Sequence, residues 1–305
     1  MKIPTKLSSK LREVFPPKNL LPLLFSYTVD HIALSTYWIF FAIWLSEKLT
    51  DSYMIISIVI AIPAVISVFG TAVFSSFSDK TGRRKELILF SRIALMTQYL
   101  FLIFFQNSVW IVLVILACFG LFTQIFYVMN STLLTIICHP DRRGQVSSFQ
   151  SVFASAGWMI GSFISGFIYE NLGIIGCLSF AAGFAILSGI IAMFSPIKPS
   201  YDKEEDKISS ISNPAVEFPQ TDKIIVAERT SKTSYWDIFK RPQVLTLILT
   251  LAILEFGYGP FNVITSVYLK DIGLTDSMIS INNTVATFIG MVTLLLIGKL
   301  LDQKG

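Results

Sequence analysis

Charged residues are scarce in this sequence. Asp, Glu, Lys and Arg make up 14% of the 305 residues, whereas hydrophobic residues make up 53% and the mean hydropathy is +0.66. So few charges cannot cover a soluble domain of this length, because soluble proteins carry about 25% charged residues. The composition excludes an ordinary soluble globular protein and indicates an integral membrane protein whose main partner is the lipid bilayer.

Residues that build metal sites, disulfides and catalytic centres are also rare. The chain has 2 histidines and 3 cysteines, and Cys118, Cys138 and Cys177 form no C-x-x-C pair. The sequence also shows no nucleophile and base pattern and no phosphate-binding glycine loop. We therefore expect a protein that is not an enzyme and that binds no metal or other cofactor.

Long apolar runs occupy most of the chain instead. Eight of them reach the roughly 20 residues that a helix needs to cross a bilayer. The predicted membrane spans are Leu20–Leu45, Tyr53–Phe77, Leu87–Phe105, Val109–Ile137, Val146–Ile168, Ile174–Phe194, Val244–Leu269 and Met278–Leu301. The sequence thus predicts an all-α, polytopic membrane helical bundle.

Lys and Arg are distributed unevenly between the predicted loops. With the N-terminus inside, the inside segments carry 21 of these residues and the outside segments carry 2, Lys48 and Lys270. Cytoplasmic loops retain positive charge, so this asymmetry predicts a plasma-membrane protein with a cytoplasmic N-terminus. It also accounts for the net charge of +4 without a nucleic-acid partner.

A long charged segment separates the sixth predicted span from the seventh. Residues 196–242 contain the run Asp202-Lys-Glu-Glu-Asp-Lys207 with scattered Ser, Thr and Pro, a composition typical of a disordered linker. We therefore divide the chain into a six-helix bundle at 1–195, a cytoplasmic linker with an interfacial helix at 196–242, and the first two helices of a second bundle at 243–305.

Short sequence elements recur between the two parts of the chain at nearly constant spacing. Leu49-Thr-Asp-Ser52 returns as Leu274-Thr-Asp-Ser277, 225 residues later. The carboxylates Asp30 and Glu255, each inside a predicted span, are separated by the same 225 residues. The sequence therefore predicts a parallel repeat in which the two acids occupy equivalent positions.

A motif typical of a basic turn between two spans occurs twice in the sequence. Ser75-Ser-Phe-Ser-Asp79-Lys-Thr-Gly82-Arg83-Arg84 lies between the second and third spans, and Gly298-Lys-Leu-Leu-Asp302-Gln-Lys-Gly305 comes after the eighth. Glycine permits a tight reversal, Asp can pair with basic groups, and Arg and Lys hold the turn in the cytoplasm. Both runs resemble the G-x-L-x-D-x-x-G-R-[RK] signature of the major facilitator superfamily of secondary transporters, with Ser75 in place of the first glycine.

This resemblance implies a bundle of twelve spans that works by alternating access. Eight spans are present, so we expect that the chain is truncated after the eighth helix, and we expect a monomer. The resemblance also implies a gating loop at Asp79, Gly82, Arg83, Arg84, Asp302 and Gly305.

Small residues are clustered in the fifth span. The run Gly157-x3-Gly161-Ser162-x2-Ser165-Gly166 is similar to the antiporter signature G-x3-G-P-x2-G-G, with Ser162 in place of proline. We expect Gly157, Gly161 and Gly166 to permit close helix packing, whereas the bend that proline would introduce is missing.

Polar residues follow helical spacing in spans one, four and seven, which the resemblance implies line the central cavity. A charge at mid-bilayer costs at least ~2.5 kcal/mol, so Asp30 and Glu255 are predicted to bind a proton or a cationic group. The alternative is that each acid is satisfied structurally. Their neighbours at helical spacing complete the candidate site: Tyr27 and Tyr37 in span one; Gly120, Gln124, Tyr127 and Ser131 in span four; Tyr258 and Asn262 in span seven.

His31 and Arg92 are further basic residues inside the predicted spans. We expect His31 to be a packed histidine of the bundle, since adjacent helical residues point about 100° apart and a relay with Asp30 is not indicated. Arg92 is expected to snorkel toward the cytoplasmic face or to pair with a carboxylate.

The function that these features favour is secondary active transport of a small solute. We lean to proton-coupled efflux of small amphipathic or drug-like compounds, because the stripes mix tyrosine with carboxylates and show no basic residue to attract an anion. Drug and proton antiporters of the superfamily carry R-x-x-Q-G in span four, but Leu116 stands where the arginine would be. A sugar or nutrient importer, or a uniporter, is therefore an alternative. A non-transporting membrane receptor or scaffold, or a non-functional fragment, is another.

Overall fold

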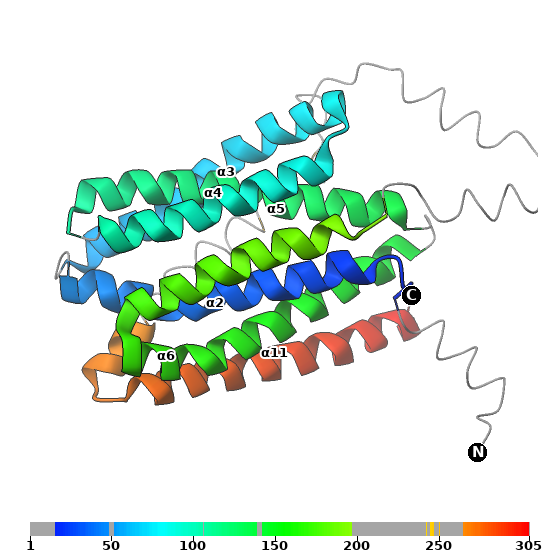
Figure 1. Ribbon diagram of the computed structural model, residues 1–305. Coiled ribbons are helices and arrows are strands. Elements are labelled where there is room, and N and C mark those ends of the chain that lie inside the picture. Colours follow the sequence, from blue (N-terminus) through cyan, green and yellow to red (C-terminus); the bar gives the residue numbers. More distant parts are fainter. Residues whose placement is uncertain are drawn as a thin grey trace, which may run out of the picture. The chain divides into compact units, whose positions relative to one another are not determined.

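The computed structural model is built from helices throughout the part of the chain that it describes (Figure 1). The described residues are 16–48, 52–105, 107–138, 142–196, 242, 245–246, 250 and 265–304. The long helices are α2 (Leu21–Lys48), α3 (Tyr53–Thr81), α4 (Arg84–Phe104), α5 (Val109–Ile137), α6 (Arg143–Met193) and α11 (Asp276–Lys304). The all-α prediction is confirmed for these residues.

The helix bounds follow the apolar runs closely. The predicted span Val109–Ile137 coincides with α5, and the predictions for α2, α3 and α4 depart from the helix ends by at most four residues. Helix α6 covers both the fifth and the sixth predicted spans, but Gly173 breaks it with φ 62° and ψ −161°. Only glycine adopts such a conformation readily, and it falls where the turn between the two spans was predicted. The seventh predicted span lies mostly outside the described residues.

Among the described residues, four helices are long and apolar enough to cross a membrane, namely α2, α4, α5 and α6. Large apolar side chains such as Phe104, Trp110 and Phe194 are about three-quarters exposed on the outside of the helices. A monomer in water rarely exposes so much apolar surface, whereas lipid accommodates it. The protein is therefore a multi-pass membrane protein.

Helix α2 is the most enclosed element. It packs along α6, while α3 packs on α5, α4 packs on both α5 and α6, and α11 packs on α6. Around the N-terminal end of α2, an apolar core joins α2, α4 and α5 through Leu24, Ile88, Phe126 and Leu134. Polar groups in the middle of α2 are consequently surrounded by other helices and not by lipid.

By its contacts the chain divides into two compact units, of which one comprises residues 1–200 and 265–305 and the other 201–264. Helix α11 thus groups with α2 to α6. The predicted domain boundaries near 195 and 242 stay predictions, because residues 197–241 lie outside the described part of the chain.

Candidate functional site

Asp30 lies near the middle of α2 and is buried. Its Oδ1 atom accepts a hydrogen bond from Nη1 of Arg92 on α4, and the two side chains form an ion pair. Arg92 is completely buried, so its guanidinium does not reach either membrane surface. The prediction that Arg92 pairs with a carboxylate is therefore confirmed, and the alternative that it snorkels to the cytoplasmic face is wrong.

The rest of the Arg92 guanidinium lies against α5. Its Cζ atom is 4.0 Å from the centre of the Phe126 ring, a cation–π contact. Nη2 donates a 3.4 Å hydrogen bond to the Phe122 carbonyl oxygen, and Nε has no hydrogen-bond partner among the described residues. A guanidinium has five N–H donors, so part of the donor capacity of Arg92 is unused in this conformation.

Arg92 also changes the electrostatics that the sequence predicted. The efflux hypothesis assumed that no basic residue accompanies the tyrosines and carboxylates. That assumption is wrong for the first half, because Arg92 is in direct contact with Asp30. The two side chains are oppositely charged, so as a pair they present a dipole and no net charge.

An aromatic cluster lies one turn before Asp30 on α2. The Tyr27 ring is 4.6 Å from the His31 ring and 5.3 Å from the Tyr127 ring of α5, and His31 is 5.6 Å from Tyr127. His31 Nδ1 lies 2.9 Å from the Tyr27 carbonyl oxygen, which can only accept, so Nδ1 carries the proton in this contact. His31 is thus packed within the bundle, as predicted.

Tyr37 lies two turns after Asp30 and is fully buried. Its ring contacts Tyr99 of α4 at 5.1 Å and Phe119 of α5 at 5.8 Å. The hydroxyl groups of Tyr37, Tyr99 and Tyr127 have no hydrogen-bond partner among the described residues. The face of α2 that bears Tyr27, Asp30 and Tyr37 therefore meets α4 and α5, and it leaves buried hydroxyls available.

The predicted polar stripe of span four is split between two neighbours. A Cβ atom at Gly120 would overlap the Pro63 carbonyl of α3, so Gly120 permits close packing of α5 on α3. Ser131 instead forms a 2.7 Å hydrogen bond with Gln150 Nε2 of α6, and Gln124 is only half-buried. Only Tyr127 of this stripe contacts the aromatic cluster beside Asp30.

Glu255, the predicted acid of the second half, has no described position in the structure. Glu255, Tyr258 and Asn262 lie outside the described residues. Their convergence with Asp30 stays a prediction.

The signature turn between α3 and α4 is built as its residues suggest. Gly82 adopts the left-handed conformation, with φ 67° and ψ 1°, and its N–H donates to the Ser78 carbonyl to end α3. Across this turn Arg84 Nη2 lies 3.0 Å from Asp79 Oδ1, and Arg83 pairs with Glu86 at 3.6 Å. The Asp of the motif thus pairs with a basic group of the same turn.

The second copy of the motif, residues 298–305, lies almost entirely in the last turns of α11. This helix continues through Asp302 to Lys304, just as α3 continues through Asp79 to Thr81. The side chain of Asp302 and all of Gly305 lie outside the described residues, so the pairing of this copy stays a prediction.

Lys85, next to the signature turn, has a role that the sequence did not indicate. Its Nζ donates to the carbonyl oxygens of Met193, at 3.0 Å, and of Ser195. A cation at the end of a helix satisfies carbonyls that lack intrahelical partners. The first turn of α4 therefore caps the C-terminal end of α6.

Two of the three glycines of the fifth span pack α6 on α2 on both sides of Asp30. A Cβ at Gly157 would overlap the Thr28 carbonyl, and a Cβ at Gly161 would overlap the Ile32 carbonyl. Gly166 has a different neighbour, because its Cβ would lie 2.6 Å from Cβ of Ser280 on α11. A side chain at any of the three positions would overlap a neighbouring helix, α2 for Gly157 and Gly161 and α11 for Gly166.

Comparison with known proteins agrees with this architecture. The Major Facilitator Superfamily model matches residues 23–305. An "Uncharacterized MFS-type transporter YfmI" of Bacillus subtilis is 28% identical over 167 residues, which are 52% of this chain and 41% of that protein. A "Multi-drug resistance efflux pump PmrA" of Streptococcus pneumoniae is 23% identical over 256 residues, which are 81% of this chain and 57% of that protein.

The chain thus spans about half the length of the curated relatives that it matches. The family model, in contrast, covers most of the chain, and its match includes the buried pair, the signature turn and α11. This chain therefore belongs to the major facilitator superfamily of transporters.

Proposed function

We propose that the protein works by alternating access as a proton-coupled exporter of small amphipathic compounds. The observation that carries this proposal is the pair of Asp30 and Arg92, the charged side chains that are buried in the described part of the bundle. Ionisable residues are rare in membrane spans and mark proton or substrate pathways when they occur. The export direction and the substrate class are supported by the name of PmrA, which matches 81% of this chain.

In the proposed cycle, Asp30 is the group that takes up and releases the proton. When ionised, it compensates the Arg92 charge. A proton on Asp30 removes that compensation and leaves a buried cation, which is unfavourable unless α2 and α4 rearrange or another group replaces the carboxylate. Protonation would thereby bias one conformation of the bundle over the other.

Tyrosine hydroxyls without a hydrogen-bond partner lie in the helices around the pair and are available to form new hydrogen bonds when the helices rearrange. The hydroxyl oxygens of Tyr37, Tyr99 and Tyr127 are buried and have no hydrogen-bond partner among the described residues. These hydroxyls are donors that a polar group of the solute can use, while the rings of Tyr27, His31 and Phe126 offer flat apolar surfaces. An amphipathic compound matches this mixture of rings and hydroxyls.

The remaining elements of the proposal extend this cycle to the whole protein. Glu255, with Tyr258 and Asn262, would supply the corresponding acid of the second half. The two signature turns, at Asp79 to Arg84 and at Asp302 to Gly305, would form the cytoplasmic gate. We further propose that the protein is a monomer in the plasma membrane with its N-terminus in the cytoplasm.

Two alternatives have support from specific observations. Leu116 occupies the position of the coupling arginine in span four and is fully buried, which favours a uniporter or a sugar or nutrient importer. The pairing of Asp30 with Arg92 also allows a purely structural role, which favours a non-transporting receptor or scaffold. The exporter, the uniporter or importer, and the receptor or scaffold are expected to give different results in a single flux experiment.

The test is flux in proteoliposomes that contain the purified protein and an imposed pH gradient. A lipophilic cationic dye reports solute movement, and a trapped pH indicator reports proton movement. We expect gradient-driven dye transport with opposite proton flux. Asp30→Asn should abolish the coupling, whereas Glu47→Gln, which removes an exposed carboxylate at the end of the same helix, should not.

Asp30→Asn leaves Arg92 unpaired, so the neutral double variant Asp30→Asn/Arg92→Gln serves as a second test. Proton-coupled flux in this double variant would contradict the proposed role of Asp30. Dye flux without proton flux in the parent would identify a uniporter. The absence of flux for dyes, sugars and amino acids would favour the receptor or scaffold.

A further inference from the structure

The contact between α6 and α11 has a polar centre. The Ser280 hydroxyl of α11 donates to the Ser162 carbonyl oxygen of α6 and accepts a 3.2 Å hydrogen bond from the Gly166 N–H. Its oxygen also lies 3.4 Å from the Ser165 hydroxyl. Ser280 is buried, so water cannot replace these hydrogen bonds if they are lost.

The two backbone groups that Ser280 bonds belong to one turn of α6. Ser162 and Gly166 are four residues apart, which makes them the acceptor and the donor of a single helical hydrogen bond. In lipid, backbone groups are normally satisfied within their own helix. A side chain from another helix that bonds both ends of one turn therefore makes an unusually specific contact, and Gly166 permits it because it has no side chain.

A second contact continues the same crossing by one turn on each helix. Glu170 lies four residues after Gly166, and its Oε1 atom accepts a 3.0 Å hydrogen bond from the Ser277 N–H at the start of α11. The Thr275 hydroxyl accepts from the Met278 N–H at 3.3 Å. The carboxylate of α6 thus caps the N-terminus of α11, where negative charge is favourable.

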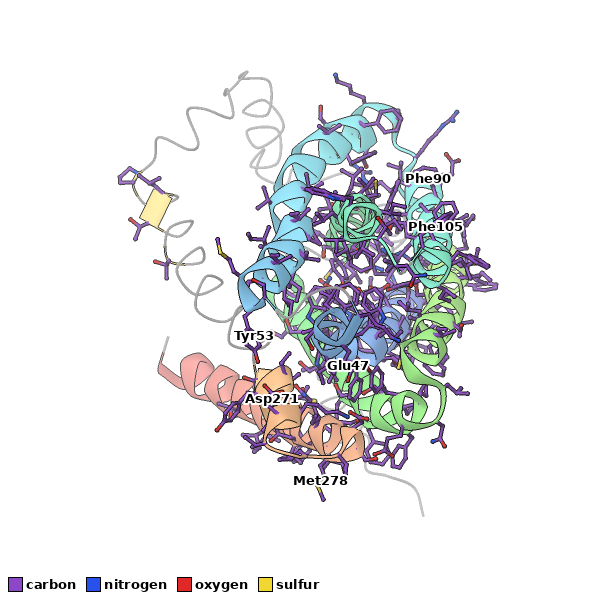
Figure 2. The ribbon with its side chains drawn as sticks, turned by 90° about the vertical axis from the view of Figure 1, so that its left-hand side faces the viewer. Glu47, Tyr53, Phe90, Phe105, Asp271 and Met278 are labelled. Atoms are coloured by element: carbon purple, nitrogen blue, oxygen red, sulfur yellow. The ribbon has the colours of Figure 1, made fainter. Side chains whose placement is uncertain are left out.

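A third contact comes from a different helix of the first half. Tyr53, the first residue of α3, donates a 3.0 Å hydrogen bond to Asp271 Oδ2 (Figure 2). Asp271 ends the helical residues 265–271, which precede α11. Lys270 pairs with Asp276 at 2.6 Å and so ties these residues to the start of α11.

These contacts are all made at one end of the spans. Tyr53 begins α3, Glu170 lies three residues before the Gly173 break, and Asp271 and Ser277 flank the turn before α11. The signature turn, with Asp79 and Arg84, lies at the opposite end of α3. In the proposed topology the contacts are therefore on the outer side of the membrane.

We infer that Ser280, Glu170 and the Tyr53–Asp271 pair form an outer clasp between the first six spans and α11, and that Ser280 is the positioning residue that holds it shut. This inference rests on the proposed alternating-access function. Opening the outer side separates the two halves at this end, so the clasp must break in each cycle. The strength of the Ser280 contact then sets the population of the outward-closed state.

Cross-linking measures this population directly. Tyr53→Cys and Asp271→Cys, in a protein whose natural cysteines Cys118, Cys138 and Cys177 are replaced by serine, place two thiols where the side chains meet. The rate of cross-linking by a short membrane-impermeant reagent in proteoliposomes reports the closed clasp. Adding Ser280→Ala should lower this rate, because the ratio of closed to open clasp falls about five-fold, the loss expected for one hydrogen bond.

The matched control is Thr284→Val, which removes a hydroxyl one turn further along α11. The Thr284 hydroxyl donates to the Ser280 carbonyl of its own helix at 2.9 Å and forms no hydrogen bond with α6 among the described residues, so the cross-linking rate should stay at the parent value. Should Ser280→Ala fail to fold, Glu170→Gln keeps the side-chain shape and weakens the cap. It should then lower the rate by a smaller factor.

An unchanged rate in both Ser280→Ala and Glu170→Gln would overturn the clasp. This result is distinguishable from a failure of the proposed function, because cross-linking needs no solute. A lower rate in Ser280→Ala together with no flux in the parent would keep the clasp and reject transport. Flux in the parent with unchanged cross-linking would keep transport and reject the clasp.

Discussion

Two aspartate and arginine pairs in the described part of the chain have completely different surroundings. Asp30 and Arg92 come from α2 and α4, are 62 residues apart in the sequence, and have side chains that are 3% and 0% exposed. Asp79 and Arg84 lie within one turn, five residues apart, and are 65% and 22% exposed. The same two residue types thus form a buried contact between helices and a local surface contact.

The difference in burial decides which of the two pairs can control the conformation of the bundle. At the surface, water and salt replace a lost partner, so an exposed pair contributes about 0.2–1 kcal/mol. Inside the bundle nothing replaces the partner, and removing one charge of a buried pair costs about 3–5 kcal/mol. A proton added to Asp30 therefore has a large effect on the bundle, whereas one added to Asp79 has a small effect.

The largest expected effect comes from breaking the buried pair. Arg92→Met leaves the Asp30 carboxylate without its cation and should lower the free energy of unfolding by about 3–5 kcal/mol. The measurement is thermal and denaturant unfolding of the purified protein in detergent. The double variant Asp30→Asn/Arg92→Met has no unpaired charge and should recover most of the loss. Equal stability of Arg92→Met and the parent would show that the pair contributes little.

A smaller effect should follow from moving α2 away from its place beside α6. Gly161→Ala puts a methyl group into the Ser35 hydroxyl and the Ile32 carbonyl, and such overpacking costs about 1–3 kcal/mol. Because Ile32 lies next to the turn that bears Asp30, the buried pair should weaken as well. Gly183→Ala is the control, since a Cβ there meets nothing within 4 Å. Comparable melting temperatures for the two variants would contradict the close packing.

The turn that holds the exposed pair should be less sensitive. Gly82→Ala places a side chain on a residue with φ 67°, which costs roughly 1–2 kcal/mol. Circular dichroism during thermal unfolding measures this cost. Gly144→Ala, another loop-side glycine with open space around it, should leave the melting temperature nearly unchanged. If Gly82→Ala matched Gly144→Ala, the left-handed cap would not be needed to form the turn.

The smallest effect is expected for the exposed pair itself. Arg84→Gln should change the free energy of unfolding by only about 0.2–1 kcal/mol, and raising the salt concentration should erase the difference. Unfolding at low and high salt measures both quantities. A loss as large as that of Arg92→Met, independent of salt, would abolish the contrast between the two pairs.

Much of the fold could be predicted from the sequence because lipid imposes simple rules. An apolar run must become a helix when it crosses a bilayer, so the ends of α5 and the break at Gly173 followed from composition alone. Tyr27, Asp30 and Tyr37 were assigned to one face of α2 by their spacing, and that face does meet α4 and α5.

Contacts between helices were harder to predict, because spacing within one helix does not give its register against another. The Arg92 partner and the turn of α6 that Ser280 bonds both depend on such registers. Gly120 was assigned to a polar stripe for the same reason, although it packs on Pro63. One signal was present for Arg92: a cation deep in a span needs a nearby anion, and Asp30 was the carboxylate deep within the first six predicted spans.

Lys85 has a mechanical consequence for the first half of the protein. Through it the third span, α4, is fastened to the last residues of the sixth, where the backbone leaves α6. The backbone at Met193 and Ser195 is consequently held beside the signature turn. A force on the backbone at Ser195 would therefore act, through the Lys85 ammonium group, on the first turn of α4, the helix that bears Arg92.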